Sequence, residues 1–239
     1  MNLYTNLAHV YHEMYCHLFD YRKEFDFYHS ILSEFSGVSI IEHGCGSGHL
    51  AKHFIQHGYD YLGVDLHDQM LDIARRSIPE HHLAQGDMCT FTSQIQKDAI
   101  LITGRSISYL YDDGQIRAML AKSHHNLKSG GKLIFDAIDG FELFKDFDSS
   151  EKEVVVGAYK RISRSIARTP DTYTWDWYAT YYQMDDRGDQ KLGDDHATVR
   201  AFTNEEITKF LSDAGFGQIL IYPKETYTWK DNYFVATKL

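Results

Sequence analysis

The spacing of hydrophobic residues changes along the chain and defines its first elements. Leu7, Val10 and Met14 lie three or four residues apart, which predicts a helix over residues 3–19. A second helix is expected over residues 22–35, before a glycine. From residue 38 onward the apolar residues gather in short runs, which are typical of buried strands. The chain therefore begins with two helices and continues into a sheet.

Strands and helices are expected to alternate over the next hundred residues. The predicted strands are residues 38–42, 60–65, 81–85, 99–104 and 132–138, and the predicted helices between them are residues 48–57, 67–77 and 112–127. Residues 129–131, Ser-Gly-Gly, are interpreted as the stop of the last of these helices. Such alternation favours a parallel sheet with helices on its faces, the Rossmann-like arrangement of α/β proteins.

The pattern changes after residue 150. Polar and apolar residues alternate with period two over residues 151–201, which predicts three or four antiparallel strands. Four aromatic residues are expected on one strand face: Tyr173, Trp175, Trp177 and Tyr181. An aromatic stripe of this kind is typical of a core or a dimer interface, and the other interpretation is a wall that packs on a substrate.

The last part of the chain returns to the α/β pattern. Thr203 precedes a helix that Gly215 closes, and strands are predicted at residues 217–222 and 232–237. These two strands complete a seven-stranded sheet. We therefore expect one α/β domain from residues 1–150 and 202–239, in which residues 1–36 form a helical lid. Residues 151–201 are then an antiparallel β insertion that serves as a substrate lid or a dimer interface.

Composition narrows the classes of protein. The chain has 239 residues, a hydrophobic content of 43% and a net charge of −10. A general nucleic-acid binder needs a basic surface, so this class is not expected. No apolar run is long enough for a membrane helix, and the first residues do not resemble a secretory signal, so we expect a cytoplasmic protein with reduced cysteines.

The sequence IIEHGCGSGHL at residues 40–50 is the strongest local motif. A predicted strand ends in an acid, Glu42, and a loop with Gly44, Gly46 and Gly48 leads into a helix. Glycines let the backbone take positive φ and approach a ligand closely. The free N–H groups at the start of the following helix then point at that ligand. Cys45 lies inside this loop, so the motif predicts a ligand site that contains it.

Two further acids follow predicted strands at suitable distances. Asp65, with Leu66 after it, ends the second strand and is placed to accept hydrogen bonds from ribose hydroxyls. Gly86, Asp87 and Met88 follow the third strand. Carboxyl ends of parallel strands meet at one edge of a sheet, so these groups are expected to share one site.

Together these three motifs resemble those of class I S-adenosylmethionine (SAM)-dependent methyltransferases. The resemblance implies that SAM is the cofactor and S-adenosylhomocysteine (SAH) the product. It implies that Asp87 accepts a hydrogen bond from the adenine amino group and that Met88 packs on the purine. Glu42 would orient the glycine loop or meet the methionyl amine through water.

A narrower resemblance covers nearly the whole chain. Residues 7–21 and 105–110 are similar to segments of bacterial nucleotide-aminosugar N,N-dimethyltransferases. The chain departs from that group at four places: Glu42-His43, Arg105, Ala137-Ile138 and the spacing after His196. Since such positions read the substrate, the resemblance does not identify the acceptor.

Candidate residues for contact with the donor or the acceptor come from three segments. Tyr11 and Tyr15 share one face of the first helix, either as core residues or as a lid over the ligand. Ser106 and Tyr109 follow the fourth strand, where Ser106 or its backbone would meet the methionyl part and Tyr109 would face the substrate. The alternative is a capped turn with Tyr109 in the core. His196 is the candidate base or substrate-orienting group, with a surface histidine as the alternative. No metal site is expected, because no acid or cysteine accompanies the histidines at 49, 53 and 57 on their helix.

The predicted function is methyl transfer from SAM to a small molecule, at nitrogen in preference to oxygen. The expected partner is that small molecule, with no nucleic acid and no membrane, and a homodimer is possible through the aromatic insertion. A catalytically silent SAM-binding sensor or partner subunit is the alternative. An NAD(P)-dependent oxidoreductase is opposed by the glycine spacing. Methylation of nucleic-acid bases is opposed by Gly-Arg-Ser-Ile at residues 104–107, where an Asn/Asp-Pro-Pro motif is needed.

Overall fold

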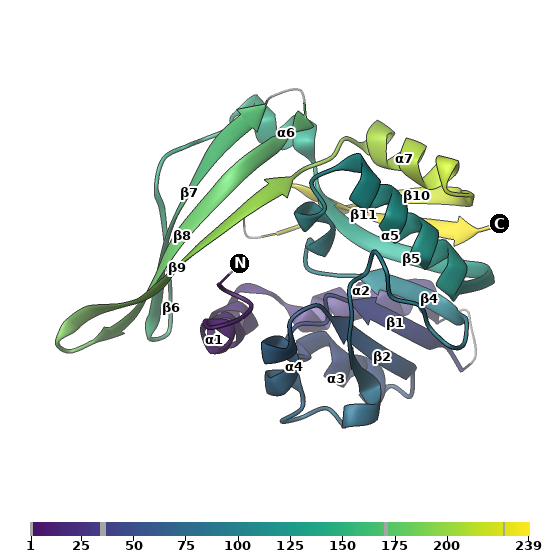
Figure 1. Cartoon of the computed structure of the whole chain (residues 1–239), viewed down its shortest axis with the longest axis horizontal. Helices are drawn as coiled ribbons and strands as arrows, with labels where there is room; N and C mark the ends of the chain where they lie inside the picture. Colours follow the sequence, from purple (N-terminus) through teal and green to yellow (C-terminus); the bar gives the residue numbers. More distant parts are fainter. Residues whose placement is uncertain (1, 34–36, 170–171, 227) are drawn as a thin grey trace.

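A computed structural model describes residues 2–33, 37–169, 172–226 and 228–239. The chain forms a main α/β body and a separate antiparallel sheet that extends from one side of it (Figure 1). The end of the helix predicted at residues 22–35 lies outside the described residues. Within the described part, no helix is both long and apolar enough to cross a membrane.

The main sheet has seven strands in the order β10-β11-β5-β4-β1-β2-β3. The strands are β1 (Ser39–His43), β2 (Asp60–Asp65), β3 (Leu83–Gln85), β4 (Lys97–Ile102), β5 (Leu127–Ile138), β10 (Phe216–Lys224) and β11 (Asp231–Lys238). Strands β1 to β5 pair in parallel, whereas β11 pairs antiparallel with both β5 and β10. The predicted seven-stranded sheet is confirmed.

Helices cover both faces of this sheet because its central strands are apolar on both sides. The helices are α1 (Ala8–Leu18), α2 (Tyr21–Leu32), α3 (His49–Gln56), α4 (Asp68–Ala74), α5 (Asp113–Asn126), α6 (Gly140–Lys145) and α7 (Asn204–Asp213). Ile40 packs in a cluster with α2 and α3, whereas its neighbour Ile41 packs in a cluster with α5 and α7. The alternation of side chains along β1 thus builds one hydrophobic layer on each face.

The predicted stop of the fifth helix at residues 129–131 is wrong. Helix α5 ends at Asn126, and Leu127 is already extended and fully buried. The Asn126 side chain fixes this end, because its Nδ2 donates to Phe91 O and its Oδ1 accepts from Ser93 N, both at 3.0 Å. Gly130, at φ +75°, instead lies in an irregular stretch of β5 where its pairing with β4 shifts register.

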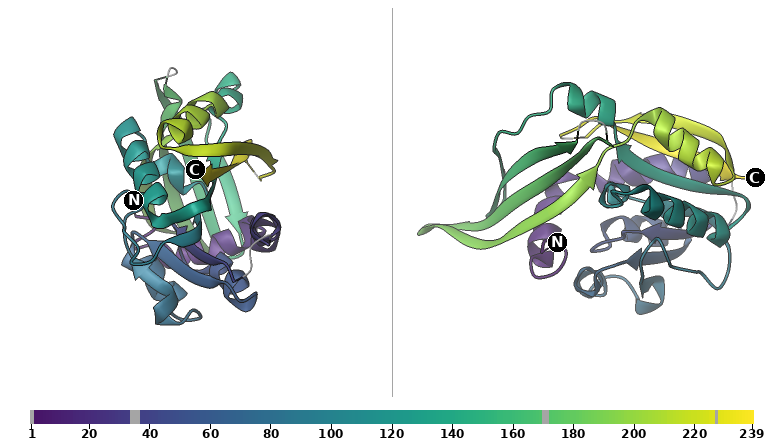
Figure 2. Two further views of the ribbon diagram at one scale, coloured as in Figure 1. Left: turned by 90° about the vertical axis from the view of Figure 1, so that its right-hand side faces the viewer. Right: turned by 45° about the horizontal axis from the view of Figure 1, so that its top comes forward.

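The insertion is a four-stranded antiparallel sheet, in the order β6-β7-β8-β9. Its strands are β6 (Lys152–Val156), β7 (Tyr159–Thr169), β8 (Thr174–Asp185) and β9 (Gly188–Arg200). Figure 2 shows that β7, β8 and β9 form a long twisted arm that extends beyond the main body. Tyr173 was expected on the aromatic face of β8. It lies before the strand instead, at φ +46°, and packs on Phe144.

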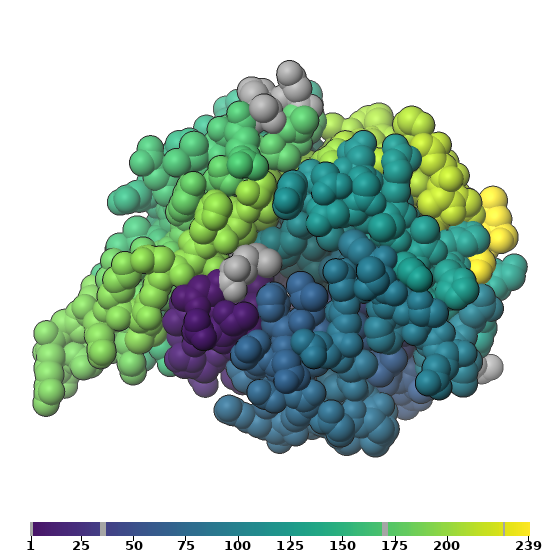
Figure 3. All heavy atoms as spheres, viewed as in Figure 1, coloured from purple at the N-terminus to yellow at the C-terminus, as the bar shows by residue number. Residues whose placement is uncertain are grey.

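The N-terminal segment fills the angle between this arm and the main body (Figure 3). Leu7, Val10 and Met14 pack with Tyr181 of β8 in one apolar cluster. The backbone N–H groups of Asn2 and Leu3 both donate to Asp195 Oδ1 on β9, the second at 3.2 Å. The aromatic face of β8 that suggested a dimer interface is therefore covered, in part, within the chain itself.

Candidate active site

The glycine loop after β1 is folded by the backbone conformations that its glycines permit. Gly44, Gly46 and Gly48 have φ of +73°, +55° and +79°. Gly44 N donates to Val64 O at 2.8 Å, which ties the start of the loop to β2. Gly48 ends the loop directly before α3 and faces Ile78 and Ala74, so it supports the loop from behind.

Asp65, at the end of β2, holds this loop through hydrogen bonds. Its Oδ2 accepts from Gly46 N at 2.8 Å and its Oδ1 accepts from His67 N at 2.9 Å. Burial raises the pKa of Asp65, and the two backbone donors oppose that shift. Each carboxylate oxygen has a further lone pair available to a ligand hydroxyl.

The segment after β3 forms the far wall of the same site. Asp87 Oδ1 accepts from Cys89 N at 2.8 Å, which fixes the turn that presents Met88. A Cβ on Gly86 would lie 2.6 Å from the Phe91 ring, so the chain passes this point only as glycine. Leu66 is 53% exposed and borders the opening.

Glu42, the acid at the end of β1, is buried beneath the loop. Its Oε2 accepts from Tyr61 OH at 2.6 Å and its Oε1 accepts from Thr103 Oγ1 at 2.7 Å. Burial raises the pKa of Glu42 to about 7, against the effect of both hydrogen bonds. The side chain therefore joins β1 to Tyr61 near the start of β2 and to Thr103 directly after β4, and its pKa lies near neutral pH.

Replacing Glu42 with glutamine is expected to stabilise the protein more at pH 8 than at pH 5. The folded protein binds the Glu42 proton more tightly than the unfolded chain, since the pKa rises from 4.5 to about 7. Stability from this group is thus lost as pH rises between these values, at a cost of about 3 kcal/mol when complete. Denaturant unfolding measures the free energy of unfolding of E42Q minus that of the unaltered protein. This difference should be about 2 kcal/mol larger at pH 8 than at pH 5. An equal difference at both would contradict this pKa.

These groups line one cavity, which we call the first cavity, at the carboxyl ends of β1, β2 and β4. Of the residues predicted from sequence, it brings together Tyr11, Glu42, Gly44, Cys45, Gly46, Asp65, Leu66, Gly86, Asp87, Met88, Ser106 and Tyr109. Ser106 Oγ donates to Thr103 O at 2.7 Å and lies against Gly44. Sequence reasoning thus located most of this wall.

A second cavity lies beside the first, under the insertion. Its walls are aromatic and polar: Trp175 and Trp177 of β8, Arg161 of β7, Trp229 before β11 and Tyr15 of α1. Tyr15 was predicted to bind the cofactor, but it lines the second cavity, where its OH accepts from Arg161 Nη1 at 2.9 Å. The lid helix α1 therefore contributes to both cavities.

The two cavities share five lining residues: Tyr4, Tyr11, Phe19, Gly104 and Tyr109. The Tyr4 and Tyr109 hydroxyls are 2.7 Å apart, and the Tyr4 ring meets Tyr11 edge-on at a centroid distance of 5.3 Å. Burial raises the pKa of the Tyr4 and Tyr109 phenols, so both stay protonated at neutral pH. Tyr109 can therefore donate or accept a hydrogen bond here but is not an anionic base.

His196, predicted as a base, is placed outside both cavities. Its side chain is 52% exposed on β9, 3.3 Å from Asp176 Oδ1, and its ring stacks on Tyr178 at a centroid distance of 4.5 Å. Tyr178 is itself exposed. The histidine belongs to the face of the insertion that points away from α1, so the surface interpretation fits its position.

Several lining residues were not identified from the sequence. They are Tyr4, Phe19, Tyr21 and Glu24 from the N-terminal segment, and Arg161, Lys224 and Trp229 from later elements. The aromatic density of the first 21 residues was a usable signal for Tyr4, Phe19 and Tyr21, but not for Glu24. No local pattern marks the second group, because only the fold brings them to the site.

The chain is similar to known methyltransferases in sequence and in structure. Residues 40–131 match the family described as methyltransferase domain. A dTDP-3-amino-3,4,6-trideoxy-alpha-D-glucopyranose N,N-dimethyltransferase of Streptomyces venezuelae is 29% identical over 130 residues, which cover 54% of this chain and 53% of that protein.

Solved structures share the whole architecture. A S-adenosylmethionine-dependent methyltransferase of Clostridium acetobutylicum covers 99% of both chains with a TM-score of 0.80 and 19% identity. SAM-bound CalS10, an amino pentose methyltransferase of Micromonospora echinaspora, covers 92% of this chain and 90% of its own, with a TM-score of 0.70 and 22% identity. These likenesses confirm the class I methyltransferase fold, and the matched domain contains the glycine loop, Asp65 and Asp87.

Proposed function

We propose that this chain, a class I SAM-dependent methyltransferase by its fold and by the domain at residues 40–131, methylates a nitrogen atom of a small molecule. The observation that carries the proposal is the shared wall of the two cavities. A donor in the first cavity and an acceptor in the second would meet at Tyr4, Tyr11 and Tyr109. Holding two reactants in contact at one point is the main contribution that an enzyme of this class makes.

The residues of the first cavity fit SAM. Asp65 and Asp87 would hold the ribose and the adenine, and the glycine loop lets the backbone approach the ligand. When bound, SAM supplies a methyl group on a positively charged sulfur, already activated for transfer to a nucleophile. The protein then has to align the acceptor with that methyl group and keep water away.

The second cavity supports a nitrogen acceptor. An alcohol needs a base to remove its proton, whereas a neutral amine reacts with its own lone pair. Among the described residues that line this cavity there is no histidine. Its carboxylates are Asp146, Asp148 and Glu153, and the Lys152 ammonium lowers the pKa of Asp148, which makes that carboxylate a weak base. The aminosugar and amino pentose enzymes reported above also point to an amine.

The aromatic walls have two roles in this proposal. Trp175, Trp177 and Trp229 exclude water from the acceptor. Their ring faces also attract the cation that an amine becomes when it gains a methyl group. The product then releases a proton to solvent, which restores a neutral amine. Cytoplasmic location, the absence of nucleic-acid and membrane partners, and homodimerisation remain predictions.

Incubation with methyl-labelled SAM and a panel of amines, including aminosugar nucleotides, is expected to label an amine and to spare its hydroxyl analogue. W177A should lower turnover about tenfold, since it removes a ring that lines the second cavity, while SAH affinity stays unchanged. Y178A and H196A are matched controls on the opposite face and should retain activity.

Each outcome of this experiment bears on the proposal. Label on the hydroxyl analogue alone would show that the acceptor atom is oxygen and not nitrogen. Tight SAH binding without turnover on any acceptor would favour the silent SAM-binding protein.

A further inference from the structure

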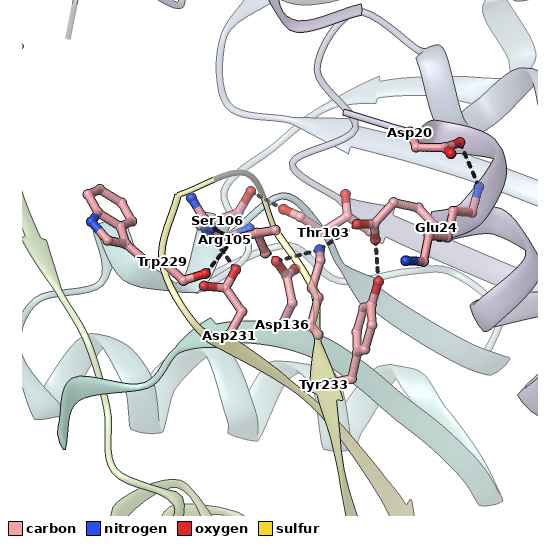
Figure 4. Close-up of polar contacts among 12 residues, drawn as sticks. Asp20, Glu24, Thr103, Arg105, Ser106, Asp136, Trp229, Asp231 and Tyr233 are labelled. Carbon is pink, nitrogen blue, oxygen red and sulfur yellow. Dashed lines mark hydrogen bonds and ion pairs between the residues drawn. The ribbon is translucent and has the colours of Figure 1, made fainter. Parts of the chain in front are cut away.

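A buried ionic cluster lies where α2 meets the ends of β5, β10 and β11 (Figure 4). Lys224 Nζ is 2.7 Å from Glu24 Oε1 and 3.0 Å from Asp136 Oδ2. Only 3% of the Lys224 side chain and 15% of the Glu24 side chain are exposed. Glu24 Oε2 also accepts from Tyr233 OH at 2.8 Å, so its carboxylate is fixed in place.

Glu24 and Lys224 both reach the wall of the first cavity. Among the described residues that line this cavity, Lys224 carries the only permanent positive charge. The acids there are Glu24, Glu42, Asp65 and Asp87. Two of them, Asp65 and Asp87, lie at the ends of the strands assigned to the adenosine part. A donor in the opposite orientation would leave these carboxylates without a partner.

The amino-acid end of SAM carries one carboxylate and one ammonium group. A buried site for such a pair needs a cation and an anion held close together, because an isolated buried charge is costly. Burial alone would lower the pKa of Lys224, but the neighbouring carboxylates of Asp136 and Glu24 raise it by more. The net shift of the pKa is upward, so the side chain stays charged. A lysine ammonium has three donors, and Glu24 and Asp136 use two of them.

We propose that Lys224 binds the α-carboxylate of SAM and that Glu24 binds its α-ammonium group. The inference rests on SAM as the donor and not on the identity of the acceptor. Asp136 and Tyr233 are then positioning residues, because they hold Lys224 and Glu24 without reaching the ligand themselves. The same cluster continues through Asp136 to Arg105 of the second cavity, whose backbone N donates to Asp136 Oδ2 at 3.0 Å.

Calorimetry with three ligands tests the two roles separately. SAH carries both charged groups, decarboxylated SAH keeps only the ammonium, and 5′-methylthioadenosine lacks both. K224M is expected to weaken SAH about 10- to 100-fold and to leave the other two ligands unchanged. E24Q is expected to weaken SAH and decarboxylated SAH by similar factors, and to spare 5′-methylthioadenosine.

The neighbouring pair supplies the control. Lys23 and Glu225 join the same two segments at 2.8 Å, but their side chains are 66% and 89% exposed. K23M should leave all three affinities unchanged. Because K224M removes a buried charge, its affinity for 5′-methylthioadenosine reports whether the cavity is still folded. E24Q keeps the size of the side chain and gives a milder second variant.

Three results would overturn the inference. One is a parallel loss of affinity for SAH and for 5′-methylthioadenosine in E24Q, which would make the pair of Glu24 and Lys224 merely structural. Another is unchanged SAH affinity in K224M, which would assign the carboxylate to the backbone at the start of α3. The third is a loss of affinity for decarboxylated SAH in K224M that is as large as the loss of affinity for SAH. Failure of the unaltered protein to bind SAH would instead refute the proposed function.

Discussion

Replacing Asp65 with alanine is expected to weaken SAH binding about 100-fold, the largest loss we expect from a single side chain in the first cavity. The carboxylate accepts from Gly46 N and His67 N, and it would also accept from the ribose hydroxyls. Each hydrogen bond to a charged group contributes at least about 1.5 kcal/mol, and two lost together, about 3 kcal/mol, correspond to about 100-fold in affinity. Calorimetry with SAH measures this directly.

A second aspartate on the same strand provides the control. Asp60 begins β2, where its side chain is 67% exposed and 2.8 Å from Lys97 Nζ. D60N removes only a surface ion pair, so its SAH affinity should stay within about twofold of the unaltered protein. D65N keeps the shape of the side chain and separates lost charge from a collapsed loop. SAH affinity of D65A within about threefold of the unaltered protein would contradict the role assigned to Asp65.

The first cavity was largely predictable because its signals are local. Gly44 and Gly46 must be glycine for backbone reasons that are readable in one segment. Asp65 and Asp87 each follow a strand of the same parallel sheet, and the carboxyl ends of parallel strands meet at one edge. A sequence pattern and one topological rule were therefore enough to bring them together.

The ion pair of Glu24 and Lys224 had no such signal. Glu24 lies on the second helix and Lys224 at the end of β10, near opposite ends of the chain. Each one taken alone is an ordinary charged residue beside another charged residue, Lys23 or Glu225. Only the packing of α2 on β11 buries Glu24 and Lys224 and leaves their sequence neighbours in solvent. Burial of this kind depends on tertiary structure, which the local pattern does not contain.

The place of His196 was hard to predict for a different physical reason. Alternation along a strand separates two faces but does not say which face another element covers. His196 is paired with Tyr178 across the two strands, and Trp177 is paired with Ala197. Directly paired residues share a face, so His196 lies with Tyr178 in solvent while Trp177 faces the cavity. The position of α1 decides between the faces, and it was not known from sequence.

Helix α1 couples the insertion to the donor site. Val10 and Met14 pack with Tyr181 of the insertion, whereas Ala8 packs with Met70 and Ile73 of α4. Tyr11, between these contacts, lines both cavities. The insertion is thus more than a cover for the acceptor, because it also holds the helix that closes the donor site.

Replacing Gly44 with alanine is expected to lower SAH affinity more than tenfold and to destabilise the protein. Two effects act together. Positive φ costs an L-residue about 1–2 kcal/mol, and a Cβ here would overlap Ser106 Oγ and lie 3.0 Å from Ser106 Cβ. The overlap pushes apart the loop after β1 and the loop after β4, both of which line the first cavity. Calorimetry and thermal unfolding measure the two losses.

A glycine elsewhere and a second substitution separate these effects. Gly58 has φ +79° with no atom within 4 Å of a Cβ, so G58A isolates the backbone cost, about 2–8 °C in Tm, without loss of SAH affinity. S106A removes the overlapping oxygen, so the double variant G44A/S106A should recover part of the affinity lost in G44A. Neighbouring substitutions that relieve a shared clash are non-additive in this direction. Strictly additive losses would show that the loops after β1 and β4 do not clash through Ser106. The effect of G44A on the first cavity would then come from backbone conformation alone.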